Sequence, residues 1–190
     1  LARPEEANEL LDLAVAQLRW MCATHPAQSS NHRRLALVLN TLADLRARTG
    51  DLDGARVPSG EAVRVLEALV ARAPGDGSEA MLGKLLITDA RIRAAPRNLG
   101  GEVDTAAIDA ALRRGIALLE NAPAEVRSAR DTRVPLTLAW VQLAANHQSA
   151  GRVDEAVAAL EHATAETEAM VKAEPALPEL RRNLVDRRLD

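Results

Sequence analysis

Four prolines at nearly constant spacing constrain the fold of this chain more than any other feature of its sequence. Pro26, Pro74, Pro123 and Pro175 stand 48, 49 and 52 residues apart, and each follows a segment whose apolar residues have helical spacing. A period of this length indicates a repeat architecture, in which each unit is one supersecondary element that packs on the next. The chain is therefore expected to be an array of similar units.

Small and large apolar residues keep fixed distances from these prolines. Alanine stands twelve residues before each proline, and nineteen before three of them, with Asp104 in the third unit. Small residues let two helices cross closely, and larger apolar residues a few turns later fill a core. The larger residues, predicted to be core positions, stand five and four residues before each proline: Met21, Cys22, Leu69, Val70, Leu118, Leu119, Met170 and Val171.

The composition is that of an all-α protein. The chain has no Phe and no Tyr, its β-branched runs are short, and it is rich in Ala, Leu, Glu and Arg, which favour helices. A further helix is expected in each full unit, at about 29–48, 78–94 and 133–149, closed by Gly50, by Gly100 and Gly101, and by Gly151. Glycine supplies the left-handed conformation that ends a helix. The unit is thus helix, tight turn, helix and proline, which gives about eight helices.

Pro58 interrupts the second helix of the second unit. A proline inside a helix removes one backbone hydrogen bond and clashes with the preceding turn. We therefore expect a kink or a restart there, with Ser59 as the new N-cap.

We expect one domain over residues 1–190, with units at about 1–26, 27–74, 75–123, 124–175 and a partial 176–190. The array starts with a second helix at 4–24 and stops with a first helix at 177–189, so each end lacks one neighbour. This phase predicts either a fragment of a longer protein or a chain that self-associates through its end helices. The apolar stripes concerned are Leu10, Leu11, Ala14, Leu18 and Met21 at one end and Leu177, Leu180 and Leu184 at the other.

The repeat resembles the tetratricopeptide repeat family. That family's pattern of W-x2-L-G-x2-Y, A-x3-F and P meets Trp140, Leu143, Ala144, His147, Ala156, Leu160 and Pro175 in the fourth unit, and Leu39, Leu42, Ala43, Arg46, Ala55, Ser59 and Pro74 in the second. The stretch LNTLADLRARTGDLDGA from Leu39 looks like the longer repeats of kinesin light chains and of actinobacterial regulatory proteins. The departure is length, because a standard unit has about 34 residues.

This resemblance implies a right-handed α-solenoid of antiparallel helix pairs, whose first helices line a concave groove for a peptide or a partner helix. Asn40 is the strongest single candidate, since an amide both donates to and accepts from a peptide backbone. The groove positions that the resemblance implies are Leu37, Asn40, Asp44, Ala47 and Arg48 in the second unit and Leu138, Val141, Ala145, Gln148 and Ser149 in the fourth.

Charge and cysteine content exclude several classes. The net charge of −3 leaves no excess of positive charge to neutralise phosphates, which argues against a nucleic-acid binder. Cys22 is the only cysteine, so no disulfide forms within the chain, and no apolar run is long enough for a membrane helix. We expect a soluble, cytoplasmic protein. Arg makes up 22 of the 24 basic residues, a bias that looks like a high-GC bacterial genome.

No phosphate-binding loop, nucleophile elbow or HExxH motif is present, so neither an enzyme nor a cofactor is expected. A remote alternative is a zinc-dependent enzyme built on Cys22, His25 and His32, although Cys22 occupies a core position of the repeat. His147 and His162 are interpreted as packing residues. The leading function is a non-enzymatic protein-interaction module, and the alternative is a structural or oligomerisation segment of a larger bacterial regulatory protein.

Overall fold

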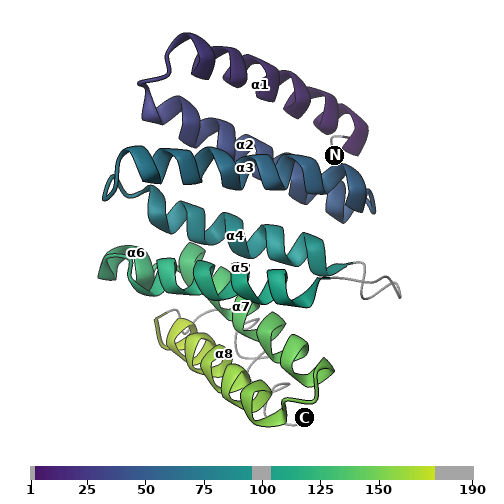
Figure 1. The fold of residues 1–190 in the computed structure, drawn as a ribbon, viewed down its shortest axis with the longest axis vertical. Helices are drawn as coiled ribbons and strands as arrows, with labels where there is room; N and C mark the ends of the chain where they lie inside the picture. Colours follow the sequence, from purple (N-terminus) through teal and green to yellow (C-terminus); the bar gives the residue numbers. More distant parts are fainter. Residues whose placement is uncertain (1–2, 96–103, 174–190) are drawn as a thin grey trace.

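The computed structural model describes residues 3–95 and 104–173 and confirms the all-α prediction: these residues form eight helices and no strand (Figure 1). The helices expected at 4–24, 29–48 and 78–94 have these bounds. The helix predicted at 133–149 begins earlier, at Arg130, and a short helix precedes it. The turn at Gly100 and Gly101, the landmark Pro175 and the stretch 177–189 lie outside the described residues. The helices are α1 (Pro4–Thr24), α2 (Ser29–Arg48), α3 (Leu52–Arg72), α4 (Ser78–Ala94), α5 (Thr105–Glu120), α6 (Ala124–Ser128), α7 (Arg130–Ser149) and α8 (Val153–Ala173).

Glycine and aspartate form the tight turns between paired helices. Gly50 and Gly151 have φ angles of 90° and 73°, the left-handed conformation that the sequence predicted after α2 and α7. Asp51 then begins α3, since its Oδ1 accepts a hydrogen bond from the Gly54 N–H over 2.9 Å. Asp104 begins α5 in the same way, with a bond of 3.0 Å from the Ala107 N–H.

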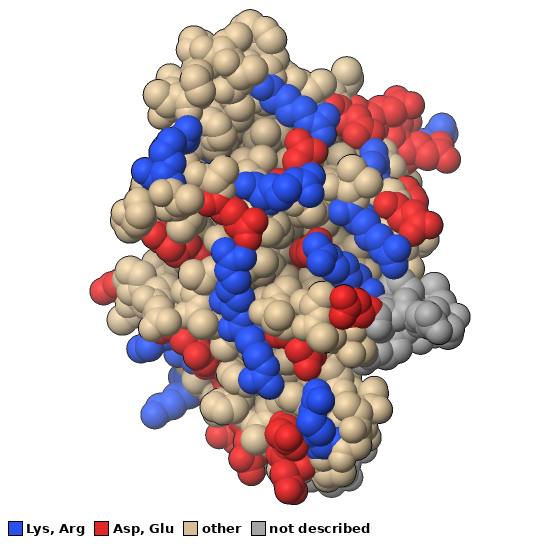
Figure 2. All heavy atoms as spheres, viewed as in Figure 1, with Lys and Arg blue, Asp and Glu red and all other residues tan. Residues whose placement is uncertain are grey.

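The long helices stack in chain order, and each packs on the one before it. In addition, α2 contacts α4 and α4 contacts α7, so these three helices form one row. We call α1, α3, α5 and α8 the second row; ion pairs Arg19–Glu61 and Arg114–Glu67 join its first three members. Figure 2 shows basic and acidic side chains interspersed over one face, with no large patch of a single sign.

The central helix α4 is buried on almost every side. Its residues Leu82, Leu85 and Leu86 belong to a core shared with α1, α2 and α3. Ile87, Ala90 and Ala94, from the same helix, enter a core shared with α5, α7 and α8. Ile92 packs with alanines of α2 and α3 in a third cluster. The three apolar clusters therefore meet on α4.

The restart predicted at Pro58 does not occur, because α3 runs through this residue. Proline has no N–H for the carbonyl four residues earlier, which is that of Gly54. Arg46 Nη1 donates to this Gly54 oxygen over 3.2 Å, and its Nη2 donates to both carboxylate oxygens of Asp12 on α1. Arg46 thus joins three helices and replaces the bond that the proline removes. Ser59 is not an N-cap; its hydroxyl donates to Asp89 Oδ1 over 2.8 Å.

Two glycines set the distance between α4 and α5. A Cβ on Gly83 would lie 2.9 Å from the Gly115 carbonyl oxygen, and a Cβ on Gly115 would lie 2.9 Å from the Gly83 oxygen. Backbone oxygens do not move aside as a flexible side chain does. The two helices therefore cross with their backbones in contact, and only glycine fits at both positions.

We expect Gly115→Ala to lower the free energy of unfolding by about 1–2 kcal/mol, because overpacking at the crossing exceeds the gain in helix propensity. Gly60→Ala is the matched control, since Gly60 lies inside α3 and its added Cβ would meet only Arg64 Nη1 at 3.6 Å. The control should gain up to about 1 kcal/mol. Urea unfolding measures both, and equal effects would contradict the close crossing.

Candidate functional site

The predicted groove residues lie on accessible faces of α2 and α7. Leu37, Asn40, Asp44 and Arg48 recur at three- and four-residue intervals and so share one side of α2. Leu37 and Arg48 are exposed there, and Asn40 and Asp44 are half-buried. On α7, Leu138, Ala145, Gln148 and Ser149 are exposed and Val141 is half-buried. Since α4 contacts both helices, the candidate site spans three helices, and we call it the α2–α4–α7 face.

A first hollow of about 440 Å³ lies between α2 and α4. Its charged residues are linked: Arg91 Nη2 donates to Asp44 Oδ1 over 2.6 Å, and Arg48 Nη1 lies 3.8 Å from Asp44 Oδ2. All three side chains are at least one-third exposed, so water screens these ion pairs and they remain available to a ligand. The hollow is lined by Asp44, Ala47, Arg48, Leu52, Arg91, Ile92 and Ala95.

A second hollow, of about 260 Å³, lies between α4 and α7 and is more apolar. Leu112 of α5 is fully buried and reaches it from the second row. Leu138, which is 42% exposed, stands in its wall. An apolar floor with a few polar groups is the usual character of a site that holds a side chain of a ligand. The hollow is lined by Ile87, Thr88, Arg91, Leu112, Pro135, Leu138, Val141 and Gln142.

Arg91 borders both hollows and was absent from the sequence prediction. The predicted groove residues came from the second and fourth units alone, so they included no position on α4. A signal was nevertheless present: Arg91 stands 47 residues after Asp44, close to the repeat length, and the two side chains pair. Thr88 and Gln142 were also missed, because only the packing of α4 on α7 brings these two side chains to the second hollow.

The structure brings some predicted residues together and leaves others apart. Asp44, Ala47 and Arg48 line the first hollow, and Leu138 and Val141 line the second. Leu37, Asn40, Ala145, Gln148 and Ser149 line neither of these hollows. Asn40 is half-buried, and within the described part of the chain its amide has no hydrogen-bond partner. This side chain therefore retains its capacity to bond to a peptide.

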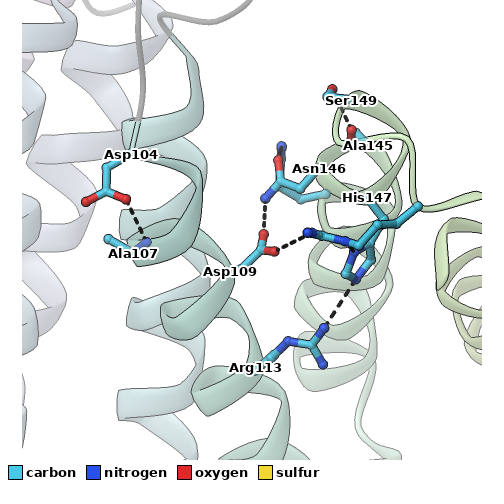
Figure 3. Close-up of polar contacts among 10 residues, drawn as sticks. Asp104, Ala107, Asp109, Arg113, Ala145, Asn146, His147 and Ser149 are labelled. Atoms are coloured by element: carbon cyan, nitrogen blue, oxygen red, sulfur yellow. Dashed lines mark hydrogen bonds and ion pairs between the residues drawn. The ribbon is translucent and has the colours of Figure 1, made fainter.

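A polar cluster fixes the end of α7 against α5 and α8 (Figure 3). Asp109 of α5 accepts hydrogen bonds from Asn146 Nδ2 and, over 3.4 Å, from Arg152 Nη2. Arg152 Nε donates to His147 Nδ1 over 2.9 Å, and Arg113 Nη2 lies 3.2 Å from His147 Nε2. His147 is buried, as the packing interpretation predicted.

His162 lies at the surface rather than in the core. Its ring stacks on the ring of Trp140, with centroids 4.3 Å apart and planes inclined by 13°. Trp140 itself is half-buried and packs on the core shared by α4, α5, α7 and α8. The contact therefore closes the outer side of the α7–α8 pair.

The residues of the zinc alternative have other contacts. Cys22 packs on the core of the first four helices, and burial raises the pKa of its thiol, which disfavours the thiolate that zinc requires. His32 Nδ1 lies 3.1 Å from the Gln28 carbonyl oxygen. Within residues 3–95 and 104–173, no three metal-ligating side chains of His, Cys, Asp or Glu come together. None of the helices that the structure describes has the length and apolar character needed to cross a membrane.

We expect Asp109→Ala to destabilise the protein by about 1–3 kcal/mol, because Asn146 and Arg152 lose their acceptor in a largely buried position. Asp53→Ala is the control, since this carboxylate is 94% exposed and should change stability by less than about 0.5 kcal/mol. Thermal and urea unfolding test the pair. Two variants of equal stability would show that the cluster contributes nothing.

A comparison with protein-family models finds no match, and no curated protein matches the chain.

Proposed function

We propose that this chain is a non-enzymatic protein-interaction module of the tetratricopeptide repeat type. In this proposal the helices form a right-handed solenoid of antiparallel pairs, α2 with α3, α4 with α5 and α7 with α8, preceded by α1. The order of helix contacts supports it, since each pair packs on the next: α4 packs on both α2 and α3, and α7 packs on both α4 and α5. The glycine turns after α2 and α7 support the same pairing.

The two adjoining hollows of the α2–α4–α7 face carry the functional proposal. A peptide or partner helix placed across the three helices would put an apolar side chain into the α4–α7 hollow, against Leu138 and Val141. Charged or polar groups of the ligand would meet Arg48 and Arg91 in the α2–α4 hollow. Asn40, on the same face of α2, would bond to the peptide backbone. A cytoplasmic location and a place in a larger bacterial regulatory protein belong to the same proposal.

The test begins with peptides selected from a random library on the immobilised chain. We expect Leu138→Glu to reduce their affinity at least tenfold, because it places a charge in the apolar hollow. Asn40→Ala should reduce the affinity of these peptides roughly three- to tenfold, as expected for the loss of one hydrogen bond. Leu160→Glu is the matched control: Leu160 is 46% exposed, similar to Leu138, but lies on α8 away from this face.

Isothermal titration of the selected peptides gives the affinities. Retained binding by Leu138→Glu, or an equal loss in Leu160→Glu, would contradict a binding site on the α2–α4–α7 face. Circular dichroism of each variant separates loss of binding from loss of folding.

A second candidate function, self-association through the end helices, is favoured by α1. Leu10 and Trp20 are 67% and 64% exposed, and Leu13 between them is also exposed. The corresponding position of α3, 48 residues after Leu10, is the buried Pro58, whereas Ala68, which corresponds to Trp20, is exposed. In this proposal a second copy of the chain covers the exposed apolar side chains of α1.

We expect Leu13→Glu to convert a dimer into a monomer, because a charge on the uncovered side of α1 opposes its burial. Light scattering at several concentrations measures the mass. A wild-type chain that is monomeric throughout, or a dimer that the substitution leaves unchanged, would reject this second function.

A further inference from the structure

The largest of the hollows described for this chain is lined by arginines and lies outside the proposed peptide site. Its volume is about 510 Å³, and it lies where α3, the end of α4 and the beginning of α5 meet. Of the eight described residues that line it, four belong to α3 and two to α5, in the second row of helices, and Asp104 directly precedes α5. The lining consists of Arg56, Val57, Gly60, Arg64, Arg93, Asp104, Ala107 and Ile108.

Arg64 supplies a guanidinium without a partner. Within the ranges that the structure describes, it makes neither a hydrogen bond nor an ion pair. Arg56, Gly60 and Arg64 follow one another at four-residue intervals and so share one side of α3. A Cβ on Gly60 would lie 3.6 Å from Arg64 Nη1, so this guanidinium lies back along α3, close to the glycine.

Arg93 supplies a guanidinium that is held in place. Its Nη2 lies 2.7 Å from Asp89 Oδ2, and the Asp89 side chain is only 4% exposed. Ser59 donates to the other Asp89 oxygen, so this carboxylate is fixed from both sides. Arg93 itself is 47% exposed and keeps N–H groups for a ligand. A guanidinium that is already positioned loses less freedom on binding.

The remaining charges leave the hollow positive. Arg56 pairs only weakly with Asp53 at 3.3 Å, because that carboxylate is almost fully exposed. Asp104 is the one acid among the described lining residues, and its Oδ1 accepts the bond from the Ala107 N–H that begins α5. The described lining thus has three guanidinium groups and one carboxylate, while Asp53 and the buried Asp89, outside the lining, pair with Arg56 and Arg93. Val57 and Ile108 add apolar surface beside them.

We propose that this hollow binds a phosphate monoester. The phosphate lies between Arg64 and Arg93, whose forked N–H donors match its oxygens, and Arg56 leaves Asp53 to add a third cation. The organic part of the ester lies against Val57 and Ile108. A phosphate monoester carries nearly two negative charges at neutral pH, which suits a site with several guanidinium groups better than a single carboxylate does. This chemistry is shared by a free metabolite and by a phosphorylated side chain of a peptide.

Titration of the whole chain with phenyl phosphate, followed by NMR of its backbone and arginine side-chain N–H groups, tests the proposal. We expect saturable shifts confined to residues around the hollow, and weaker binding of inorganic phosphate, which lacks the apolar part. Arg64→Gln should weaken phenyl phosphate binding roughly tenfold, as expected for the loss of a charge-assisted contact. Arg34→Gln is the control, because this substitution removes the same charge. Arg34 is an exposed arginine of α2 and lines none of the hollows described above.

An equal loss in the two variants would show a general charge effect and overturn the proposal, as would the absence of saturable shifts around the hollow. A second arm replaces phenyl phosphate with a short phosphotyrosine peptide. Tighter binding of the peptide, with shifts that extend beyond the hollow, identifies a phosphorylated protein as the source of the ligand. Equal affinities identify a small phosphate ester. In either case Arg64→Gln should weaken the binding of both ligands, and neither outcome requires the peptide site on the α2–α4–α7 face.

Discussion

The burial of α4 is the constraint on which the rest of the structure depends. This helix contributes to three apolar clusters, and α2, α3, α5 and α7 all pack on it. A helix covered on so many sides keeps only a narrow polar side, here with Lys84, Thr88 and Arg91, and α4 carries leucine, isoleucine and alanine around most of its remaining circumference. Its neighbour α5 comes close because Gly83 faces Gly115. Both hollows of the candidate peptide site, and the arginine hollow, adjoin this helix or its end.

Polar contacts complement the apolar cores at corresponding points of the repeat. Asp12 and Asp109 both stand fourteen residues before a landmark proline, and both accept from an arginine later in the chain, Arg46 of α2 and Arg152 directly before α8. Between them, Asp89 joins Ser59 of α3 to Arg93. Apolar surfaces slide over one another at little cost, whereas a carboxylate as buried as those of Asp89 and Asp109 requires its partner in one position. These contacts therefore fix the register of successive helices.

The bounds of α1, α2 and α4 could be predicted because prolines and glycines mark helix ends through local backbone geometry. The restart at Pro58 was predicted wrongly because the effect of this proline is not local: the donor that replaces its N–H belongs to Arg46, on another helix. The candidate site was predictable in part for a similar reason. The resemblance to tetratricopeptide repeats implied Asp44, Arg48 and Leu138 as groove positions, but only the approach of α4 to its two neighbours shows that Arg91 lies between them. The arginine hollow has no sequence signal, because Arg64 and Arg93 are close only after folding.

The two tryptophans give the two ends of the stack different optical properties. The chain has no tyrosine, so its near-ultraviolet emission comes from Trp20 and Trp140 alone. Trp20 on α1 is already in contact with water, whereas Trp140 lies beneath His162 between α7 and α8. Fluorescence therefore follows the separation of α7 from α8 and is nearly blind to the loss of α1. In a stack whose contacts are confined to near neighbours, the ends can unravel independently, so fluorescence and circular dichroism need not report the same transition.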